Sequence, residues 1–244
     1  ATCTDVTSRM RAEGAEASML QLLTEIIEGY PVGTFVLDKD HCVTLWNRAC
    51  EVITGIPANQ LIGSDEIGVD ISIDQFYIEE DGHKYMFWGS FRGIWAIELA
   101  DDGLSLKPGA GKRKIAGDQY EGTYIHKRDG YYYLIVSTGD FMKDYHVVVG
   151  RSRSLMGPYV DRAGRDMLGV HHELVVGNGN GFVAPGHNAE FVTDDKGQDW
   201  MLYHTRLEVG GPRYLILDRI EWNDGWPEVR GHVPARSAEA PVFE

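Results

Sequence analysis

The feature that most constrains this chain is a pattern of strand, tight turn and aromatic strand that occurs three times after Glu66. The turns are Asp81-Gly82, Asp129-Gly130 and Lys196-Gly197, and their glycines lie 48 and 67 residues apart. Each turn is followed by a strand rich in aromatic residues, at 85–88, 131–136 and 200–203. Glycine turns of this kind join neighbouring antiparallel strands. Repetition of such units, with helices nearly absent, predicts about three four-stranded blades of a β-propeller.

The composition divides the chain into two parts near residue 66. Eleven of the 12 Tyr, five of the six Trp and 24 of the 29 Gly lie after that position. We therefore predict a mainly β protein, with a small α+β segment over residues 1–66 and the propeller portion over residues 67–244. Further strands are expected in the second part at residues 94–99, 145–150 and 214–222.

Charge and hydropathy exclude several classes of partner. The 37 acidic and 23 basic residues give a net charge of −14, which argues against nucleic acid, because its binding relies on clustered cations. The short basic run Lys112-Arg113-Lys114 is expected to be a solvated turn. No apolar run of about 18 residues occurs and the start at Ala1 lacks the pattern of a signal peptide, so we expect no membrane partner.

The first part has the residue pattern of a small α+β module. Helical spacing of apolar residues ends at Glu28, where Gly29 suits a C-cap, and a hairpin is expected over residues 33–46. Asn47 can cap a following helix over residues 48–54. With its Pro-Val-Gly-Thr-Phe-Val-Leu-Asp and Val-Thr-Leu-Trp-Asn-Arg stretches, the segment 20–65 resembles the N-terminal half of a PAS domain. This resemblance implies a ligand-sensing module as one alternative function, although we expect Trp46 and the cysteines to be packing residues rather than a haem or flavin site.

One ionisable residue lies at the equivalent position of each repeated unit. Asp74, Glu121 and His187 precede the turn glycines by eight, nine and ten residues, at the start of the expected innermost strands. A propeller brings these strand starts to its axis, so we expect the three side chains to line one cavity. Two carboxyl groups there suit glycosidic hydrolysis, in which one donates a proton and another activates water. The alternative is that both acids are solvated strand ends.

Several motifs make residues 67–244 similar to glycoside hydrolase family 43. They are Asp70-Ile71-Ser72-Ile73-Asp74, Trp88-Gly89-Ser90-Phe91-Arg92-Gly93, Glu121-Gly122-Thr123-Tyr124 and Pro185-Gly186-His187-Asn188. The resemblance implies part of a five-bladed propeller that hydrolyses arabinofuranosyl or xylosyl linkages of plant polysaccharide with inversion. By match, Glu121 is the general acid and Asp74 the residue that orients and tunes it. His187 matches a histidine near an axial metal ion, often calcium held largely through water, and no organic cofactor is implied.

Two departures from the family pattern bear on activity. Gln75 stands where a proline usually follows the second Asp, which is a mild change in backbone stiffness. The family's first blade and most of its second, where the general base lies, have no counterpart in this chain. We therefore expect an impaired glycosidase, with a carbohydrate-binding protein that retains the sugar cleft without turnover as the alternative.

The resemblance also implies which residues contact the sugar. Trp88 and Phe91 would form a stacking wall with Arg92 as a donor to sugar hydroxyls, although core packing explains Trp88 equally well. His204 and Arg206 follow the third aromatic strand and are candidates for the same cavity. The implied partner is an oligosaccharide or polysaccharide, and the implied location is secreted or periplasmic.

Overall fold

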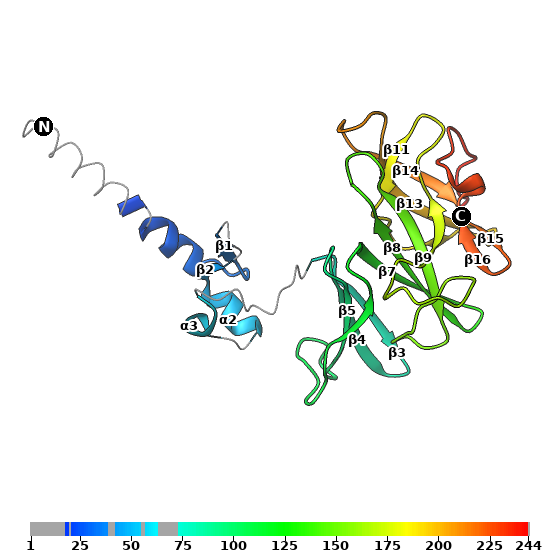
Figure 1. Ribbon diagram of the computed structural model, residues 1–244. Helices are drawn as coiled ribbons and strands as arrows, with labels where there is room; N and C mark the ends of the chain where they lie inside the picture. Colours follow the sequence, from blue (N-terminus) through cyan, green and yellow to red (C-terminus); the bar gives the residue numbers. More distant parts are fainter. Residues whose placement is uncertain (1–17, 20, 39–41, 55–56, 63–72, 244) are drawn as a thin grey trace, which may run out of the picture. The chain divides into compact units, whose positions relative to one another are not determined.

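The computed structural model describes residues 18–19, 21–38, 42–54, 57–62 and 73–243. The chain divides into two units, residues 1–69 and residues 70–244, coloured from blue to cyan and from cyan to red in Figure 1. The predicted boundary between residues 66 and 67 falls among residues 63–72, outside the described ranges.

The first unit has the helix, hairpin and short helix that the sequence predicts. Residues 21–28 are helical, and the helix ends where the Gly29 N–H donates to the Glu25 carbonyl at 3.1 Å. Strands β1 (Phe35–Leu37) and β2 (Val43–Trp46) pair antiparallel. Helices α2 (Arg48–Thr54) and α3 (Ala58–Leu61) follow.

Asn47 ties these elements together. Its Oδ1 accepts the N–H of Cys50 at 3.0 Å, which is the predicted N-cap contact of α2, and also the N–H of Thr34 at 2.9 Å. Its Nδ2 donates to the carbonyls of Ile27 and Val32. Because Asn47 is fully buried, these bonds satisfy both polar atoms of its side chain at once.

A small core holds the hairpin against the helices. Val43, Trp46 and Cys50 are buried and pack with Ala58. Burial raises the pKa of the Cys50 thiol, so Cys50 stays neutral and packs as an apolar group. The prediction that Trp46 and the cysteines are packing residues is confirmed for Trp46 and Cys50, whereas Cys42 is only partly buried and Cys3 lies outside the described residues.

Antiparallel strands make up the second unit, as Figure 1 shows. Across residues 73–243, the strands form three four-stranded sheets and one two-stranded sheet. The first sheet has the order β3-β4-β5-β6 and the second the order β10-β9-β8-β7, while in the third β13 pairs with β11, β12 and β14. The strands are β3 (Phe76–Glu80), β4 (His83–Trp88), β5 (Ile94–Leu99), β6 (Arg113–Ala116), β7 (Tyr120–Arg128), β8 (Tyr131–Thr138), β9 (His146–Ser152), β10 (Glu173–Val176), β11 (Val183–Gly186), β12 (Val192–Thr193), β13 (Asp199–Arg206), β14 (Tyr214–Arg219), and the paired β15 (Glu221–Asn223) and β16 (Trp226–Glu228), before a 3₁₀ turn at Arg230–His232.

Two-residue turns connect several of these strands. In Asp81-Gly82 and Asp129-Gly130 both residues have positive φ, from 49° to 80°, which is the geometry that matches the twist of a hairpin. The sequence did not predict a third such turn, Asp224-Gly225, between β15 and β16. The predicted Lys196-Gly197 turn instead belongs to a longer loop, closed by the hydrogen bond from the Asp194 N–H to the Gln198 carbonyl.

The second sheet is buried on both of its faces. Leu134 and Val136 of β8 pack in one core with residues of the first sheet. Tyr133 and Ile135 point the other way and pack in a second core with residues of the third sheet. Alternate strand residues face opposite sides, so a sheet covered on both sides needs continuous apolar strands. This requirement explains the unbroken apolar run of β8.

The structure confirms the prediction of a mainly β chain and corrects it in detail. Strands β6, β10, β11 and β16 were not predicted. The expectation of a turn at residues 112–114 was wrong, because Arg113 and Lys114 begin β6, where Lys114 Nζ lies 5.7 Å from the centroid of the Trp95 ring; Lys112 and Arg113 are exposed, as predicted. The number of propeller blades stays a prediction. No helix in the described part of the chain is long and apolar enough to cross a membrane.

Candidate active site

Glu121 lies near the start of β7, beside elements of two sheets. Strand pairing aligns Glu121 with Ser137 of β8, and an isolated bridge pairs it with Ser90, in the loop after β4. The Phe91 N–H donates to the Tyr120 carbonyl at 2.9 Å, which anchors the same loop against β7. Backbone contacts of the first and second sheets therefore fix the position of Glu121.

Both oxygens of the Glu121 carboxyl group accept hydrogen bonds from hydroxyl groups. Ser90 Oγ lies 2.7 Å from Oε2, and the Tyr145 hydroxyl lies 2.5 Å from Oε1. Burial, with the adjacent Glu121 carboxylate, raises the pKa of the Tyr145 hydroxyl, so Tyr145 stays protonated and donates. Two donors on two oxygens fix the orientation of the carboxyl plane.

Asp74 contacts the peptide next to Glu121. It lies just before β3 with a φ of 59°, and its Oδ2 accepts the Gly122 N–H at 3.1 Å. Gly122 has a φ of 69°, a left-handed conformation that favours glycine, while a Cβ there would meet His187 at an ordinary contact distance of 3.4 Å. Burial raises the pKa of Asp74, assisted by the charge of Glu121 and opposed by His187 and the Gly122 N–H.

His187, which follows strand β11 of the third sheet, lies close to Asp74. The expectation that His187 starts a strand was wrong, because His187 follows the end of β11, with a φ of 52°. Its N–H donates to Ser137 Oγ at 2.8 Å. Its Nε2 lies 3.7 Å from Asp74 Oδ1. The structure thus places the three predicted residues, one from each four-stranded sheet, around the starts of β3 and β7, whereas their chemical roles stay predictions.

A pocket of about 190 Å³ opens beside Asp74 and His187. Thr123, Asn188 and Glu190 also line it. Glu121 is not among the lining residues, so the expected common cavity is found for Asp74 and His187 but not for Glu121, whose carboxyl group is held by Ser90 and Tyr145. Thr123 and Asn188 are each 8% exposed, and within the described ranges Thr123 Oγ1 and Asn188 Oδ1 have no hydrogen-bond partner. Buried polar atoms are normally satisfied, so these two oxygens are unusual features of the residues that line the pocket.

The residues that line the pocket carry oxygen atoms of the kinds that bind a hard cation. Carboxylate, hydroxyl and amide oxygens come from Asp74, Thr123 and Asn188, and Ca²⁺ binds such oxygens. Among the residues that the structure describes, no group of three or more His, Cys, Asp or Glu side chains is arranged to hold a metal ion. A cation at this place would therefore keep water among its ligands.

Trp88, Phe91 and Arg92 lie at the end of β4 and in the loop that carries Ser90. Trp88 pairs with Trp95 of β5 and is half-buried. Phe91 is exposed and has a φ of 52°, and the Arg92 side chain is exposed. The loop places these three residues beside the Glu121 contact, and their sugar-binding role stays a prediction.

His204 and Arg206 lie on β13, in different surroundings from each other. The His204 ring stacks on Tyr145 with 5.7 Å between ring centroids, and burial lowers its pKa to about 4. Arg206 is 7% exposed and donates to the carbonyls of Phe141 and Gly211. The Arg206 guanidinium group thus holds two of the protein's own loops, and neither residue is tested as a sugar contact.

Comparison with protein-family models decides the family. The model described as glycosyl hydrolases family 43 matches residues 58–227, well over half of the chain. The chain belongs to glycosyl hydrolase family 43. A model of the PAS fold matches residues 21–81, so the two matches overlap over residues 58–81. This second match covers the part in which the sequence resembles a PAS domain.

Curated relatives of this family 43 chain are named as arabinan- and xylan-degrading enzymes. It is 29% identical to extracellular endo-α-(1→5)-L-arabinanase 2 of Bacillus subtilis, over 62% of this chain and 40% of the relative. It is 28% identical to the extracellular exo-α-(1→5)-L-arabinofuranosidase ArbA of Cellvibrio japonicus, over 75% and 56% respectively. Identity to a xylan 1,3-β-xylosidase of a Vibrio species is 28%, over 76% and 38%. The chain thus spans about two fifths to just over half of the length of these relatives.

Solved structures of family 43 proteins share the fold. The α-L-arabinanase of Cellvibrio cellulosa complexed with arabinohexaose superposes with a TM-score of 0.59 at 30% identity, covering 64% of this chain and 56% of that one. The family 43 YxiA protein of Bacillus licheniformis superposes with a TM-score of 0.60 at 26% identity, covering 82% and 54%. These neighbours confirm the fold class that the repeats predict.

Sequence reasoning missed the residues that surround the three candidates. Ser90 lies inside the family motif of residues 88–93, but nothing in that motif marks its hydroxyl as a partner of Glu121. Ser137 is found only once the register of β7 and β8 is known, because that register aligns it with Glu121. Asn188 belongs to the motif around His187 but was given no role of its own, and Tyr145 was predicted only as the first residue of a strand.

Proposed function

We propose that this chain carries the general acid and the modulating residue of an inverting glycosidase, acting on arabinofuranosyl or xylosyl linkages of plant polysaccharide. The observation that carries the proposal is the setting of Glu121, whose carboxyl group is oriented by two hydroxyl donors beside the peptide that Asp74 binds. Family membership supports the reaction class, and the names of the relatives support the sugars.

In this reaction Glu121 donates its proton to the glycosidic oxygen while the bond between that oxygen and the anomeric carbon breaks. The proton becomes the hydroxyl hydrogen of the leaving sugar. A water molecule attacks the opposite face of the sugar ring and gives its surplus proton to a general base. Asp74 assists by fixing the Gly122 peptide next to Glu121, and its carboxyl group lies close enough for the two charges to interact.

No residue in the described part of the chain is assigned the role of general base. In the family pattern it lies on a blade that has no counterpart in this sequence. Loss of a general base typically costs about 10²–10⁴-fold in rate. Ground-state binding does not depend on that base, so the proposal combines slow turnover with measurable sugar binding.

A calcium ion held largely through water fits the pocket beside His187. Thr123 and Asn188 would contribute the oxygens that lack partners, and Asp74 a carboxylate. The ion would supply positive charge next to the candidate carboxyl groups and order the segment that follows β11.

Steady-state hydrolysis of 4-nitrophenyl arabinofuranoside, 4-nitrophenyl xyloside and arabino-oligosaccharides tests the proposal. We expect rates far below an ordinary enzyme value of about 10 s⁻¹, with the residual rate lost in Glu121→Gln and kept in the control Glu239→Gln, an exposed acid. Turnover at an ordinary rate that disappears in Glu121→Gln would show that the base is present after all. Sugar binding without any turnover would favour the alternative, a carbohydrate-binding protein.

A further inference from the structure

Tyr145 and Ser137 lie between the Glu121 carboxyl group and the backbone at His187. Tyr145 donates to Glu121 Oε1 at 2.5 Å, and the Ser137 side chain lowers the pKa of the Tyr145 hydroxyl, against the larger effect of burial. Ser137 Oγ accepts the His187 N–H at 2.8 Å. Ser90 completes the set on the other side by donating to Glu121 Oε2 at 2.7 Å.

The residues of this connection have little room to move. Ser137 is fully buried and Tyr145 is 1% exposed. One face of the Tyr145 ring stacks on His204, and a Cβ added at Gly186 would lie only 2.0 Å from Tyr145 Cδ1. A hydroxyl group held by packing can orient its partner, whereas a mobile one cannot.

We propose that Ser137 and Tyr145 are positioning residues of the candidate active site. Together with Ser90 they form a hydroxyl clamp, defined by Ser90, Ser137 and Tyr145, that fixes both oxygens of Glu121 and couples their position to the segment after β11. This inference rests on the proposed role of Glu121 as the acid.

The chemistry of the clamp suits a group that must gain and lose a proton. All three clamp residues contribute neutral hydroxyl groups, and a hydroxyl can either donate or accept. A Lys or Arg at the same place would hold the carboxyl group in its ionised form. The clamp therefore orients Glu121 through neutral groups alone.

The coupling to His187 gives the clamp a second consequence. His187, Asn188 and Glu190 line the pocket, and the His187 N–H is the far end of the connection. A sugar that shifts this segment on binding changes the hydrogen bond from the His187 N–H to Ser137 Oγ, and with it the effect of Ser137 on the Tyr145 hydroxyl. Binding of a ligand in the pocket thus alters the hydrogen bond that Tyr145 donates to Glu121.

Carbon-13 NMR of protein labelled at tyrosine Cζ tests the clamp, because this carbon senses hydrogen bonding of the hydroxyl group. Tyr203 is the matched control, since it is also 1% exposed and its hydroxyl donates to Asp218 Oδ2 at 2.6 Å. Replacing each tyrosine by Phe assigns its resonance. We expect Glu121→Gln and Ser137→Ala to shift the Tyr145 resonance and leave that of Tyr203 in place. Asp218→Asn should do the reverse.

The same samples separate failure of the clamp from failure of the proposed function. Saturating arabino-oligosaccharide should shift the Tyr145 resonance in the wild type, and this response should be lost in Ser137→Ala. A Tyr145 resonance that is indifferent to Glu121→Gln or to Ser137→Ala overturns the clamp. If the variants behave as expected but the sugar changes no tyrosine resonance, the hydroxyl clamp stands and its proposed coupling to sugar binding is contradicted.

Discussion

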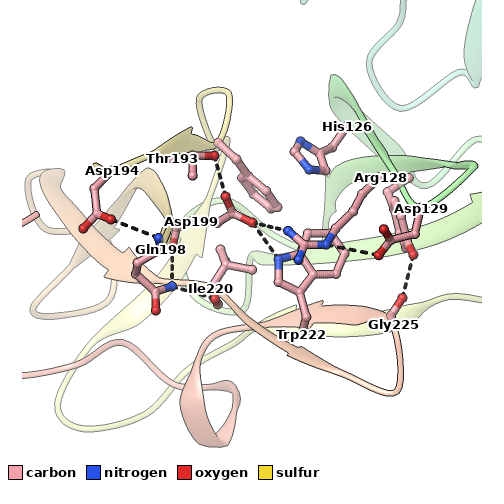
Figure 2. A network of polar contacts seen from close by, with 12 residues as sticks. His126, Arg128, Asp129, Thr193, Asp194, Gln198, Asp199, Ile220, Trp222 and Gly225 are labelled. Carbon is pink, nitrogen blue, oxygen red and sulfur yellow. Dashed lines mark hydrogen bonds and ion pairs between the residues drawn. The ribbon is translucent and has the colours of Figure 1, made fainter. Parts of the chain in front are cut away.

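Arg128 of β7 donates to Asp199 of β13 across the junction of the second and third sheets, with 2.9 Å between Nη1 and Oδ2. Asp199 is 4% exposed and also accepts the Thr193 hydroxyl at 2.6 Å and Trp222 Nε1 at 2.7 Å, as Figure 2 shows. The Arg128 guanidinium carbon lies 4.5 Å from the centroid of the Trp222 ring. One buried carboxylate therefore joins β7, β12 and the β15–β16 hairpin.

Asp199→Asn should destabilise the second unit, because an amide nitrogen would face donors that now point at a carboxylate. We expect a loss of about 2–3 kcal/mol in the free energy of unfolding, or roughly 5–10 °C in melting temperature. Asp129→Asn is the matched control, since Arg128 also contacts Asp129, at 3.4 Å, but that carboxylate is 81% exposed. Equal melting temperatures for the two variants would show that the buried contact does not join the sheets.

The stability of the protein should fall in mild acid because of His172. Burial lowers the pKa of His172 to about 4, with the charges of His146 and His171 acting in the same direction, and its Nδ1 is hydrogen-bonded to the Tyr120 hydroxyl at 2.8 Å. The unfolded chain binds this proton near pH 6.5. Between pH 6.5 and 4 the unfolded state thus binds more protons than the folded state. The contribution of neutral His172 to stability is therefore fully present above pH 6.5 and is lost as the pH falls toward 4.

Urea denaturation at pH 7.5, 5.5 and 4.5 measures this dependence. His172→Phe should lower stability at pH 7.5, because the Tyr120 hydroxyl loses its partner, but should flatten the decline toward pH 4.5. We expect only part of the decline of stability with falling pH to disappear in this variant, because burial also lowers the pKa of His204 to about 4 and His204 contributes to the same decline. An unchanged slope in the variant would contradict the assignment to His172.

Gly186→Ala should disturb the candidate active site through sterics alone. The added Cβ would lie 2.0 Å from Tyr145 Cδ1, and the Tyr145 ring also stacks on His204. We expect the free energy of unfolding to fall by about 1–3 kcal/mol and the Tyr145 ring to be displaced. Gly111→Ala is the control, because a Cβ there meets nothing within 4 Å. Thermal melts in which both variants match the wild type would contradict this packing.

The sequence predicted the elements whose residues carry their own local signal. Asp81-Gly82 and Asp129-Gly130 fixed two hairpins because both residues of each turn adopt positive φ, which this dipeptide tolerates. Strand β6 was missed because Arg113 and Lys114 are charged, and their place in the sheet depends on pairing with β5. Local propensity does not encode such pairing.

The candidate site divides in the same way. Asp74, Glu121 and His187 were found because each stands at a repeated position relative to a turn glycine. The hydroxyl clamp was not found, because Ser90, Ser137 and Tyr145 come from separate elements and meet only through the register of β7 with β8 and the bridge between Ser90 and Glu121. Long-range register is a property of the packed sheets rather than of any local pattern.

Calcium should raise the melting temperature if the pocket holds a cation. At a concentration 100 times its dissociation constant the ion would add about 2.7 kcal/mol. Asn188→Ala should abolish the effect, because it removes a buried oxygen that lacks a partner, whereas the control Asn223→Ala, at an exposed position of β15, should keep it. An equal response to magnesium, or an undiminished calcium response in Asn188→Ala, would argue against this site.

Calorimetric titration with an α-1,5-linked arabino-oligosaccharide tests most directly whether the family 43 portion retains a sugar site around Glu121. We predict saturable binding by the wild type, with a dissociation constant in the range of about 1 μM to 1 mM typical of enzyme substrates. Glu121→Gln should bind within a few-fold of the wild type, because a general acid acts in the transition state, while Arg92→Ala should bind more weakly. No heat of binding at millimolar sugar, from protein that melts cooperatively, would contradict the proposed site.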